Sequence, residues 1–414
     1  MEVGGFIIRD TDGRKTFIST PLLPRSISFL SRRSRNRCAH YSTITTKSAS
    51  RRASGIRSFY TLYPTALVFY ILSEFNLKSP NQTQPMKALR LISLLFATAL
   101  ASAMILALTF GGPRDLPPMA SINDPFKNVD FADVPAASHF TARDGMQLTF
   151  SAYPALESKS KGSVVLVHGT SAERSSMHVL AKAFAAADYA AYALDVRGHG
   201  ESGTKGSIAY VGQLEDDLED FMRYVKPARP ATLAGFSSGG GFVLRFAGGN
   251  RQEQFSSYLL LSPFISQDSP TSRPGSGGWV SLGLPRYLAI ALLNAAGVHA
   301  FNGLPVIKFA LNEKAKTFLT SQYSYALAEN FRPQQDYRAN IRAVREPVRL
   351  IVGQDDEVFH ADRFAAVFKS EGKDVPVTIL PGIGHILLTL EPRAVEAAVA
   401  AVRSMDESGA GTRE

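Results

Sequence analysis

The sequence predicts an α/β protein with a mostly parallel, twisted sheet that carries helices on both faces. Short, continuously apolar runs alternate along residues 136–406 with longer segments whose apolar residues recur at helical spacing. All-apolar strands are typical of parallel sheets buried on both faces, and alternation with helices is typical of the crossovers that join such strands. One apolar run leads directly into a Gly-x-Ser-x-Gly sequence at 235–239. A serine in that context is a candidate nucleophile at a strand-to-helix turn, although a plain glycine-rich loop is the alternative.

The amino-terminal part differs in character from the rest of the chain. Residues 1–85 are rich in Ser, Thr and Arg, and residues 1–90 hold 15 Lys and Arg but four Asp and Glu. We expect residues 1–85 to be a disordered basic leader. Met86 is interpreted as a translation start, which would make this leader upstream sequence outside the natural protein. An organelle transit peptide is the alternative interpretation.

An uncharged apolar segment of 20 residues, 91–110, follows the basic residues Lys87 and Arg90. This length fits a membrane-spanning helix, so a membrane anchor is expected over 86–110. A signal segment cleaved near Ala101-Ser102-Ala103, which would make the protein secreted, is the alternative. Lys and Arg are concentrated before the segment, so the domain after it is expected outside the cytoplasm, facing the periplasm from a bacterial inner membrane.

Charge and cysteine content exclude several classes of function. The net charge of +9 comes from the leader, because residues 91–414 sum to −2. Nucleic acid is therefore not an expected partner. The single cysteine, Cys38, lies in the leader, which leaves the domain without a thiol nucleophile or a thiolate metal ligand. No spacing of His, Asp and Glu indicates a metal site, and no cofactor is expected.

The domain follows a Pro-rich tether at 111–135 and begins with a hairpin predicted by Asp144-Gly145. Apolar runs predict strands at 163–167, 190–194, 231–236, 258–261, 348–352 and 375–380. Helical spacing predicts helices at 172–188, 211–225, after Ser237, at 361–371 and at 391–405. A Gly-, Pro- and Ser-rich insertion at about 266–340 contains apolar helical pieces, and we expect it to form a helical lid. The last residues, 407–414, are expected to be a disordered tail.

Chemically active side chains follow three of the predicted strands. Ser237 follows the strand at 231–236, Asp355 and Asp356 follow 348–352, and His385 follows 375–380. The carboxyl ends of parallel strands meet at one edge of a sheet, where ligands bind. A serine hydroxyl needs a base, which a histidine supplies, and a carboxylate fixes the tautomer of that histidine. The chain order Ser, Asp, His is the order that accompanies a Gly-x-Ser-x-Gly turn.

Five segments together resemble the α/β-hydrolase superfamily, in particular its monoglyceride lipase, lysophospholipase and serine aminopeptidase-like branch. They are Val165–Gly169, Leu194–Ser202, Gly235–Gly239, Gly353–Asp356 and Gly384-His385. The resemblance implies that Ser237 is the nucleophile, His385 the general base and Asp356 the acid, with the adjacent Asp355 as the alternative acid.

The resemblance also implies the supporting parts of the site. The backbone N–H groups of Thr170 and Ser238 would form the oxyanion hole, and Gly169, Gly235 and Gly239 would be the glycines of the loop and the turn. We interpret His168 as ordering the oxyanion loop and His199 as a structural residue of its own loop. His360 follows the acid too closely in the chain to serve as its partner.

The expected function is that of a serine hydrolase of the lipase, lysophospholipase or esterase type. It would cleave small carboxylic esters, lipid-like ones above all, through an acyl-enzyme, and it would contact the membrane through the 86–110 helix. Two alternatives remain at this point. One is an aminopeptidase of the same fold, and the other is a non-catalytic binding member of the fold.

Overall fold

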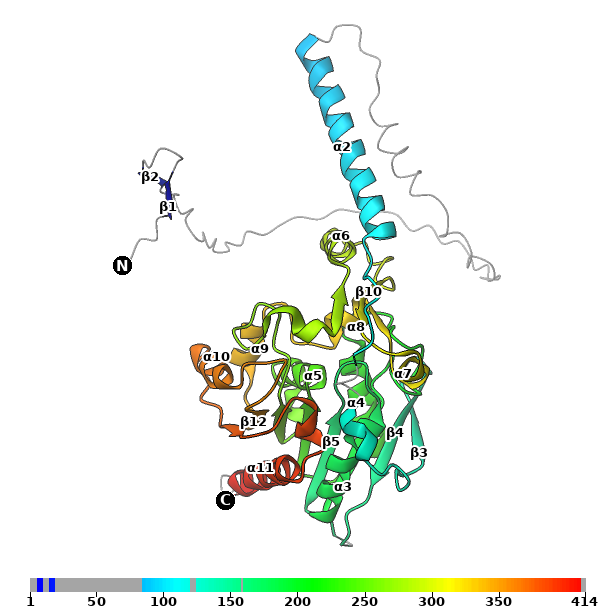
Figure 1. Ribbon diagram of the computed structural model, residues 1–414, viewed down its shortest axis with the longest axis vertical. Coiled ribbons are helices and arrows are strands. Elements are labelled where there is room, and N and C mark those ends of the chain that lie inside the picture. Colours follow the sequence, from blue (N-terminus) through cyan, green and yellow to red (C-terminus); the bar gives the residue numbers. More distant parts are fainter. Residues whose placement is uncertain (1–5, 10–14, 19–83, 120–123, 158, 411–414) are drawn as a thin grey trace, which may run out of the picture. The chain divides into compact units, whose positions relative to one another are not determined.

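The computed structural model describes residues 6–9, 15–18, 84–119, 124–157 and 159–410 (Figure 1). The chain divides into two compact units, Met1–Asn81 and Gln82–Glu414. Within the first unit, β1 (Phe6–Arg9) pairs with β2 (Lys15–Ile18) in antiparallel orientation. The other residues of the expected leader, up to residue 83, lie outside the described residues.

The second unit is built around an eight-stranded sheet with the order β13-β12-β8-β7-β5-β6-β4-β3. Six neighbouring strands of this order, β13, β12, β8, β7, β5 and β6, are parallel, and β4 and β3 add an antiparallel edge. The mostly parallel sheet predicted from the sequence is therefore confirmed. Its strands are β3 (Ala137–Thr141), β4 (Gln147–Tyr153), β5 (Gly162–Val167), β6 (Tyr189–Leu194), β7 (Ala231–Phe236), β8 (Ser257–Leu261), β12 (Val348–Gly353) and β13 (Val377–Leu380).

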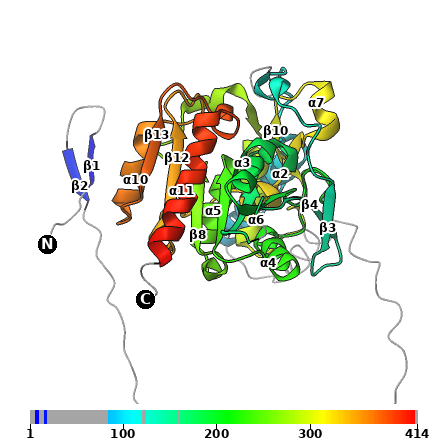
Figure 2. The ribbon, with the colours of Figure 1, turned by 90° about the horizontal axis from the view of Figure 1, so that it is seen from below.

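Helices cover both faces of this sheet, as Figure 2 shows. One face packs against α4 (Gln213–Val225), α5 (Ser238–Ala247) and α10 (Phe364–Ser370). The other face packs against α3 (His178–Ala186) and α11 (Pro392–Ala410). Side chains alternate between the two cores along each central strand, which is why these strands had to be apolar throughout. The helix α9 (Tyr337–Ala343) and the short 3-10 turns η2 (Arg174–Met177), η3 (Gln252–Gln254), η5 (Ala361–Arg363) and η6 (Ile386–Thr389) complete the body.

The insertion, residues 266–340, combines helices with a small sheet that its apolar periodicity did not reveal. Its helical parts are η4 (Pro274–Gly278), α6 (Leu284–Ala295), α7 (Glu313–Phe318) and α8 (Tyr325–Asn330). Between them β9 (Val280–Leu282), β10 (Pro305–Phe309) and β11 (Gln322–Ser324) form an antiparallel sheet in the order β11-β10-β9. Strands of three to five residues are too short for a period to emerge from the sequence.

Helix α2 (Gln84–Phe110) precedes the body, and within it Met86–Phe110 is long and apolar enough to cross a membrane. The segment after α2 is hydrogen-bonded to the insertion. The Met119 N–H donates to the Ala310 carbonyl oxygen at 2.9 Å, and Lys308 forms an ion pair with Asp115. A 3-10 turn, η1 (Asp124–Asn128), follows before β3 begins.

Candidate active site

Ser237 occupies the sharp turn between β7 and α5. Its backbone has φ 55° and ψ −120°, a strained conformation for a residue with a side chain. The turn brings the first residues of α5 so close to β5 that a Cβ on Gly239 would collide with the carbonyl oxygens of Val167 and His168. A Cβ on Gly235 would likewise collide with the Gly239 carbonyl. The two glycines therefore permit the approach that holds Ser237 in place.

A continuous chain of hydrogen bonds connects Ser237 with His385 and Asp356. The distance from Ser237 Oγ to His385 Nε2 is 3.0 Å, and the distance from His385 Nδ1 to Asp356 Oδ2 is 2.8 Å. An ionised carboxylate accepts only, so Nδ1 carries the proton and Nε2 is free to accept one from the serine. The imidazole packs between the rings of Phe236 and Phe359, with centroid distances of 4.7 and 5.3 Å. This packing fixes the plane of the ring.

Asp356 and Asp355 have different surroundings although they are adjacent. Asp356 is fully buried, and its Oδ1 accepts hydrogen bonds of 2.8 Å from the N–H groups of Val358 and Phe359. Burial alone would raise the pKa of this carboxyl, but interaction with His385 and the hydrogen bonds hold its pKa below the ordinary value. Asp355 is exposed to solvent. The structure thus brings Asp356, and not Asp355, to the histidine.

The Thr170 and Ser238 backbones lie on the two segments that flank the serine hydroxyl. Their side-chain hydroxyls are hydrogen-bonded to each other, which links the loop after β5 to the start of α5. Within the described part of the chain, neither the Thr170 N–H nor the Ser238 N–H donates to a protein acceptor. Gly169 keeps the loop close to β7, because a Cβ there would lie 3.0 Å from the Phe236 ring. Two backbone donors therefore remain available beside Ser237.

Residues of the insertion form hydrogen bonds with the loop that carries Thr170. Ser171 has φ 68°, and its N–H donates to the Tyr323 hydroxyl at 2.7 Å. The Ser171 hydroxyl donates to the Thr320 carbonyl at 2.6 Å, and the Thr320 N–H donates back to the Ser171 carbonyl at 2.9 Å. Tyr323 in turn donates to His199 Nε2 at 2.6 Å. The role of Tyr323 could not be predicted from the sequence, because an aromatic residue in a short strand carries no signal of a polar role.

His168 and His199 make structural contacts. His168 donates from Nδ1 to the Gly169 carbonyl at 2.8 Å and accepts at Nε2 from the Val196 N–H at 3.2 Å. Burial lowers the pKa of both His168 and His199, so both are neutral near pH 7. His360 makes no side-chain hydrogen bond to Ser237, Asp356 or His385. Among the described residues, no group of three or more His, Cys, Asp or Glu is arranged to hold a metal.

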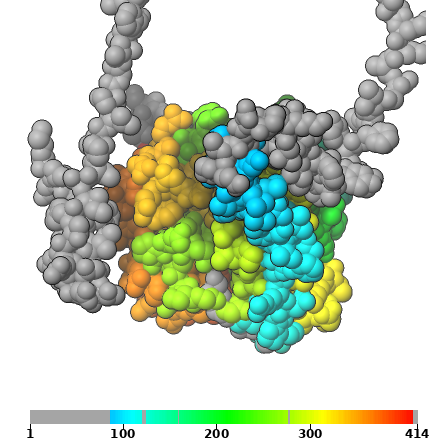
Figure 3. All heavy atoms as spheres, turned by 90° about the horizontal axis from the view of Figure 1, so that it is seen from above, coloured from blue at the N-terminus to red at the C-terminus, as the bar shows by residue number. Residues whose placement is uncertain are grey.

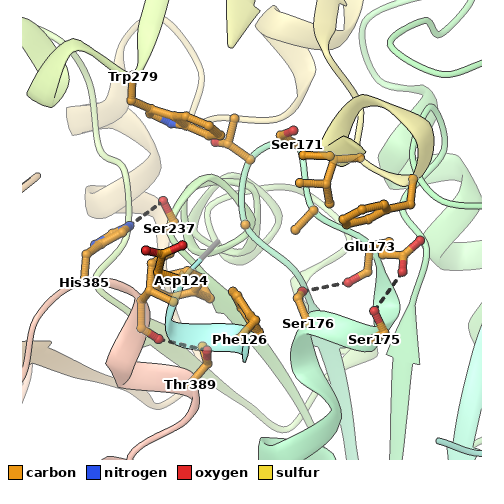
Figure 4. A pocket seen from close by; sticks show the side chains of 18 of the residues that line it. Asp124, Phe126, Ser171, Glu173, Ser175, Ser176, Ser237, Trp279, His385 and Thr389 are labelled. Carbon is orange, nitrogen blue, oxygen red and sulfur yellow. Dashed lines mark hydrogen bonds between the residues drawn. The ribbon is translucent and has the colours of Figure 1, made fainter. Parts of the chain in front are cut away.

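A cavity of about 900 Å³ extends from Ser237 and His385. Figure 4 shows these two side chains at one end and Glu173, whose pKa is raised by burial, at the other. The walls are mainly apolar and come from the insertion, from the loop after β5, and from Met119 and residues 124–134, whose composition alone did not indicate a place in the site. The apolar lining residues are Met119, Phe126, Phe131, Val134, Ala172, Phe236, Trp279, Ala315, Phe318, Leu319, Val358 and Ile386. Such a cavity fits an apolar ligand of small to moderate size.

Comparison with known proteins identifies a matching family for residues 158–393. The family model described as "Serine aminopeptidase, S33" matches residues 158–393. A monoacylglycerol lipase of Mycolicibacterium smegmatis is 31% identical over 133 residues, which cover 31% of this chain and 46% of the relative. An uncharacterized Escherichia coli protein, YnbC, is 25% identical over 284 residues, which cover 63% of this chain and 45% of the relative. The matches thus span less than half the length of these two relatives.

A solved structure shows the same fold. A soluble variant of the monoglyceride lipase of Saccharomyces cerevisiae superposes with a TM-score of 0.52 at 17% identity, covering 69% of this chain and 99% of that one. The superposition shows a shared α/β-hydrolase architecture, and at this identity it shows the fold alone.

The contacts of Tyr323 lead to a test of its role. Replacing Tyr323 by Phe removes the acceptor of the Ser171 N–H and the donor to His199, both of which are buried. We expect the free energy of unfolding to fall by about 1–3 kcal/mol, because buried polar groups lose their partners. Denaturant unfolding followed by near-UV circular dichroism measures this change. Tyr325→Phe is the control, because no hydrogen bond joins the Tyr325 hydroxyl to any residue that the structure describes; an equal loss in both variants would contradict the assignment.

Proposed function

The chain belongs to the serine aminopeptidase S33 family of α/β-hydrolases, and from that premise we propose that it is a serine hydrolase that cleaves carboxylic esters through an acyl-enzyme. The observation that carries the proposal is the hydrogen-bonded chain from Ser237 through His385 to Asp356. A nucleophile next to an oriented base is the arrangement that activates a hydroxyl at neutral pH.

In the proposed reaction Ser237 Oγ attacks the ester carbonyl carbon while its proton moves to His385 Nε2. The resulting oxyanion accepts hydrogen bonds from the Thr170 and Ser238 N–H groups, which are in place before the charge develops. The intermediate collapses to an acyl-enzyme, and His385 returns the proton to the departing alcohol. Water then attacks the acyl-enzyme by the same route, releasing the acid. Asp356 holds the imidazole in the required tautomer and stabilises its protonated form throughout.

We propose a lipid-like ester as the substrate. The mainly apolar walls of the cavity suit an acyl chain, and relatives in the comparison include a monoacylglycerol lipase. The apolar helix Met86–Phe110 would anchor the protein in a membrane with the catalytic body outside the cytoplasm, and cleavage of that segment would instead give a secreted form. Both placements bring the site to lipid esters.

Aminopeptidase activity is the second candidate function. The description of the matching family favours it, and Glu173 provides a carboxyl group in the cavity that could meet a substrate ammonium. Burial raises the pKa of Glu173, however, and so favours the uncharged form of its carboxyl group, which would bind an ammonium less well. We therefore rank ester hydrolysis first.

Replacing Ser237 by Ala tests the nucleophile. We expect kcat for p-nitrophenyl butyrate to fall by about 10⁵-fold and labelling by a fluorophosphonate to disappear, because the attacking oxygen is lost. Ser238→Ala is the matched control: its backbone N–H remains, so the rate is expected to fall by less than about tenfold. Unchanged turnover in Ser237→Ala would refute the mechanism. Absence of both turnover and labelling in the unaltered chain would favour a non-catalytic member of the fold.

The two neighbouring aspartates provide a paired test of the acid. Asp356→Asn is expected to lower kcat by about 10⁴-fold, because an amide favours the wrong imidazole tautomer. Asp355→Asn is expected to leave kcat near its original value, since that side chain is exposed. Steady-state kinetics on the same ester measures both. The assignment of Asp356 would be wrong if the larger loss belonged to Asp355→Asn.

A panel of substrates separates the two candidate functions. For p-nitrophenyl esters of increasing acyl length, we expect kcat/KM to rise by up to about fourfold per methylene until the cavity is full, because each buried methylene contributes about 0.8 kcal/mol. Alanine p-nitroanilide should be a poor substrate. An acetate ester that exceeds all longer ones would argue against an acyl-chain site, and rapid anilide cleavage would support the aminopeptidase.

A further inference from the structure

The exposed face of helix α6 is a feature that the hydrolytic site does not use. Leu284, Leu288 and Leu292 recur every four residues and are 50%, 51% and 62% exposed. On the same helix Ala289 and Ile290 are buried in the interior of the insertion. The three leucines are not among the residues that line the cavity. An aligned apolar stripe of this kind indicates a contact surface.

Arg286 connects this helix to the carboxyl end of α2. Its Nε donates to the Leu108 carbonyl at 2.8 Å and its Nη2 donates to the Thr109 carbonyl at 2.9 Å. The last carbonyls of a helix lack intrahelical donors and form the negative end of the helix dipole, so a guanidinium satisfies them in both respects. Its Nη1 donates to the Pro305 carbonyl at 2.8 Å, at the start of β10. One side chain thus joins α2, α6 and the sheet of the insertion.

Backbone hydrogen bonds also hold the end of α2 close to the insertion. The Arg286 N–H donates to the Gly111 carbonyl at 3.2 Å, and the Arg114 N–H donates to the Ser281 hydroxyl at 2.9 Å. A Cβ on Gly111 would lie 2.8 Å from the Arg286 nitrogen, so a side chain there would separate the two segments. Figure 3 shows this face, where the cyan atoms of α2 adjoin the yellow-green atoms of the insertion.

The length of α2 places the junction relative to a bilayer. The uncharged stretch 91–110 at the end of α2 extends about 30 Å at ~1.5 Å per residue, which matches the ~30 Å hydrocarbon core of a membrane. With that stretch across the core, the carboxyl end of α2, and with it Arg286, falls at the boundary between acyl chains and headgroups. The α6 stripe is continuous with this junction.

We propose that Leu284, Leu288 and Leu292 lie in the interfacial layer of the lipid leaflet at which α2 ends, and that Arg286 holds the insertion there. The partner of this surface is the bilayer that α2 crosses. The inference rests on the membrane placement of α2 that is part of the proposed function.

This arrangement gives the cavity a direct path to the membrane. Trp279 lines the cavity, and it is followed without interruption by β9 and then by α6. A lipid-like ester would move from the leaflet along this apolar edge of the insertion to Ser237. The substrate would not have to pass through bulk water.

The placement is tested with a fluorophore that reports contact with lipid. In the full chain with Cys38→Ser, Leu288→Cys is labelled with an environment-sensitive dye, and the protein is reconstituted in phosphatidylcholine vesicles. We expect a nitroxide on the acyl chain near the headgroup to lower the emission at least twofold. Tyr224→Cys on α4, a residue that is 61% exposed, is the matched control and should be quenched by less than a fifth of that effect. Equal quenching at both positions would overturn the proposal.

The same vesicles distinguish lipid from protein as the partner of α6. No quenching at 288 in chains that resist an alkaline wash would show that α6 faces water or another protein, such as a second copy, instead of lipid, and would overturn the proposal. Release of the protein from the vesicles by the wash would contradict the membrane placement of α2 and, with it, this proposal. Hydrolysis of a soluble short ester does not depend on either result, so its absence would instead count against the proposed function.

Arg286 is tested by two substitutions. Arg286→Gln, which removes the charge and most of the donors, should reduce quenching at 288 to less than half. Arg286→Lys keeps the charge but not the fork of donors, so an intermediate value is expected. Unchanged quenching in Arg286→Gln would overturn the role of this side chain.

Activity provides a second readout of the leucine stripe. Replacing Leu288 and Leu292 together by Ser should raise KM for a long-chain monoacylglycerol in vesicles by about tenfold, while kcat for a soluble short ester stays the same. An equal loss of activity toward the monoacylglycerol and the soluble ester would indicate damage to the site and contradict a membrane role.

Discussion

The strained backbone of Ser237 is the constraint on which the rest of the site depends. Ser237 is held at φ 55°, helix α5 begins at the next residue, and this helix passes against β5. Gly239 permits this contact with the carbonyls of Val167 and His168. The same approach brings the loop after β5 beside the first N–H of α5, so that the turn and the candidate oxyanion loop form a single packing unit. The hydrogen bond between the Thr170 and Ser238 hydroxyls closes that unit.

The sequence predicted the fold class and the chain positions of the candidate residues because both depend on simple regularities. Strands buried on two faces must be apolar throughout, and the carboxyl ends of parallel strands meet at one edge. Ser237, Asp356 and His385 could therefore be placed together without knowledge of the chain between them. These rules do not distinguish Asp355 from Asp356, because both follow the same strand. The choice depends on which carboxylate faces the N–H groups of Val358 and Phe359, a detail of one loop.

The remaining parts of the site depend on contacts between distant segments. Tyr323 binds the Ser171 N–H across 152 residues of sequence, and no local pattern records that partnership. The strands of the insertion are similarly stabilised by their neighbours and are too short to show a period. Met119 and Phe126 lie in a Pro-rich stretch whose composition indicated a tether, and their place in the cavity wall follows only from the three-dimensional arrangement.

The wall formed by Met119 and residues 124–134 has a practical consequence for producing the protein without helix α2. A form that begins at β3 would retain the complete sheet, but it would lack one side of the cavity and expose the apolar lining of the other side to water. Such a form is prone to self-association. A form that begins near Arg114 keeps Met119 and Phe126 and also the hydrogen bond from Arg114 to Ser281. The boundary suitable for crystallisation therefore lies between α2 and Met119, well before the first strand of the hydrolase sheet.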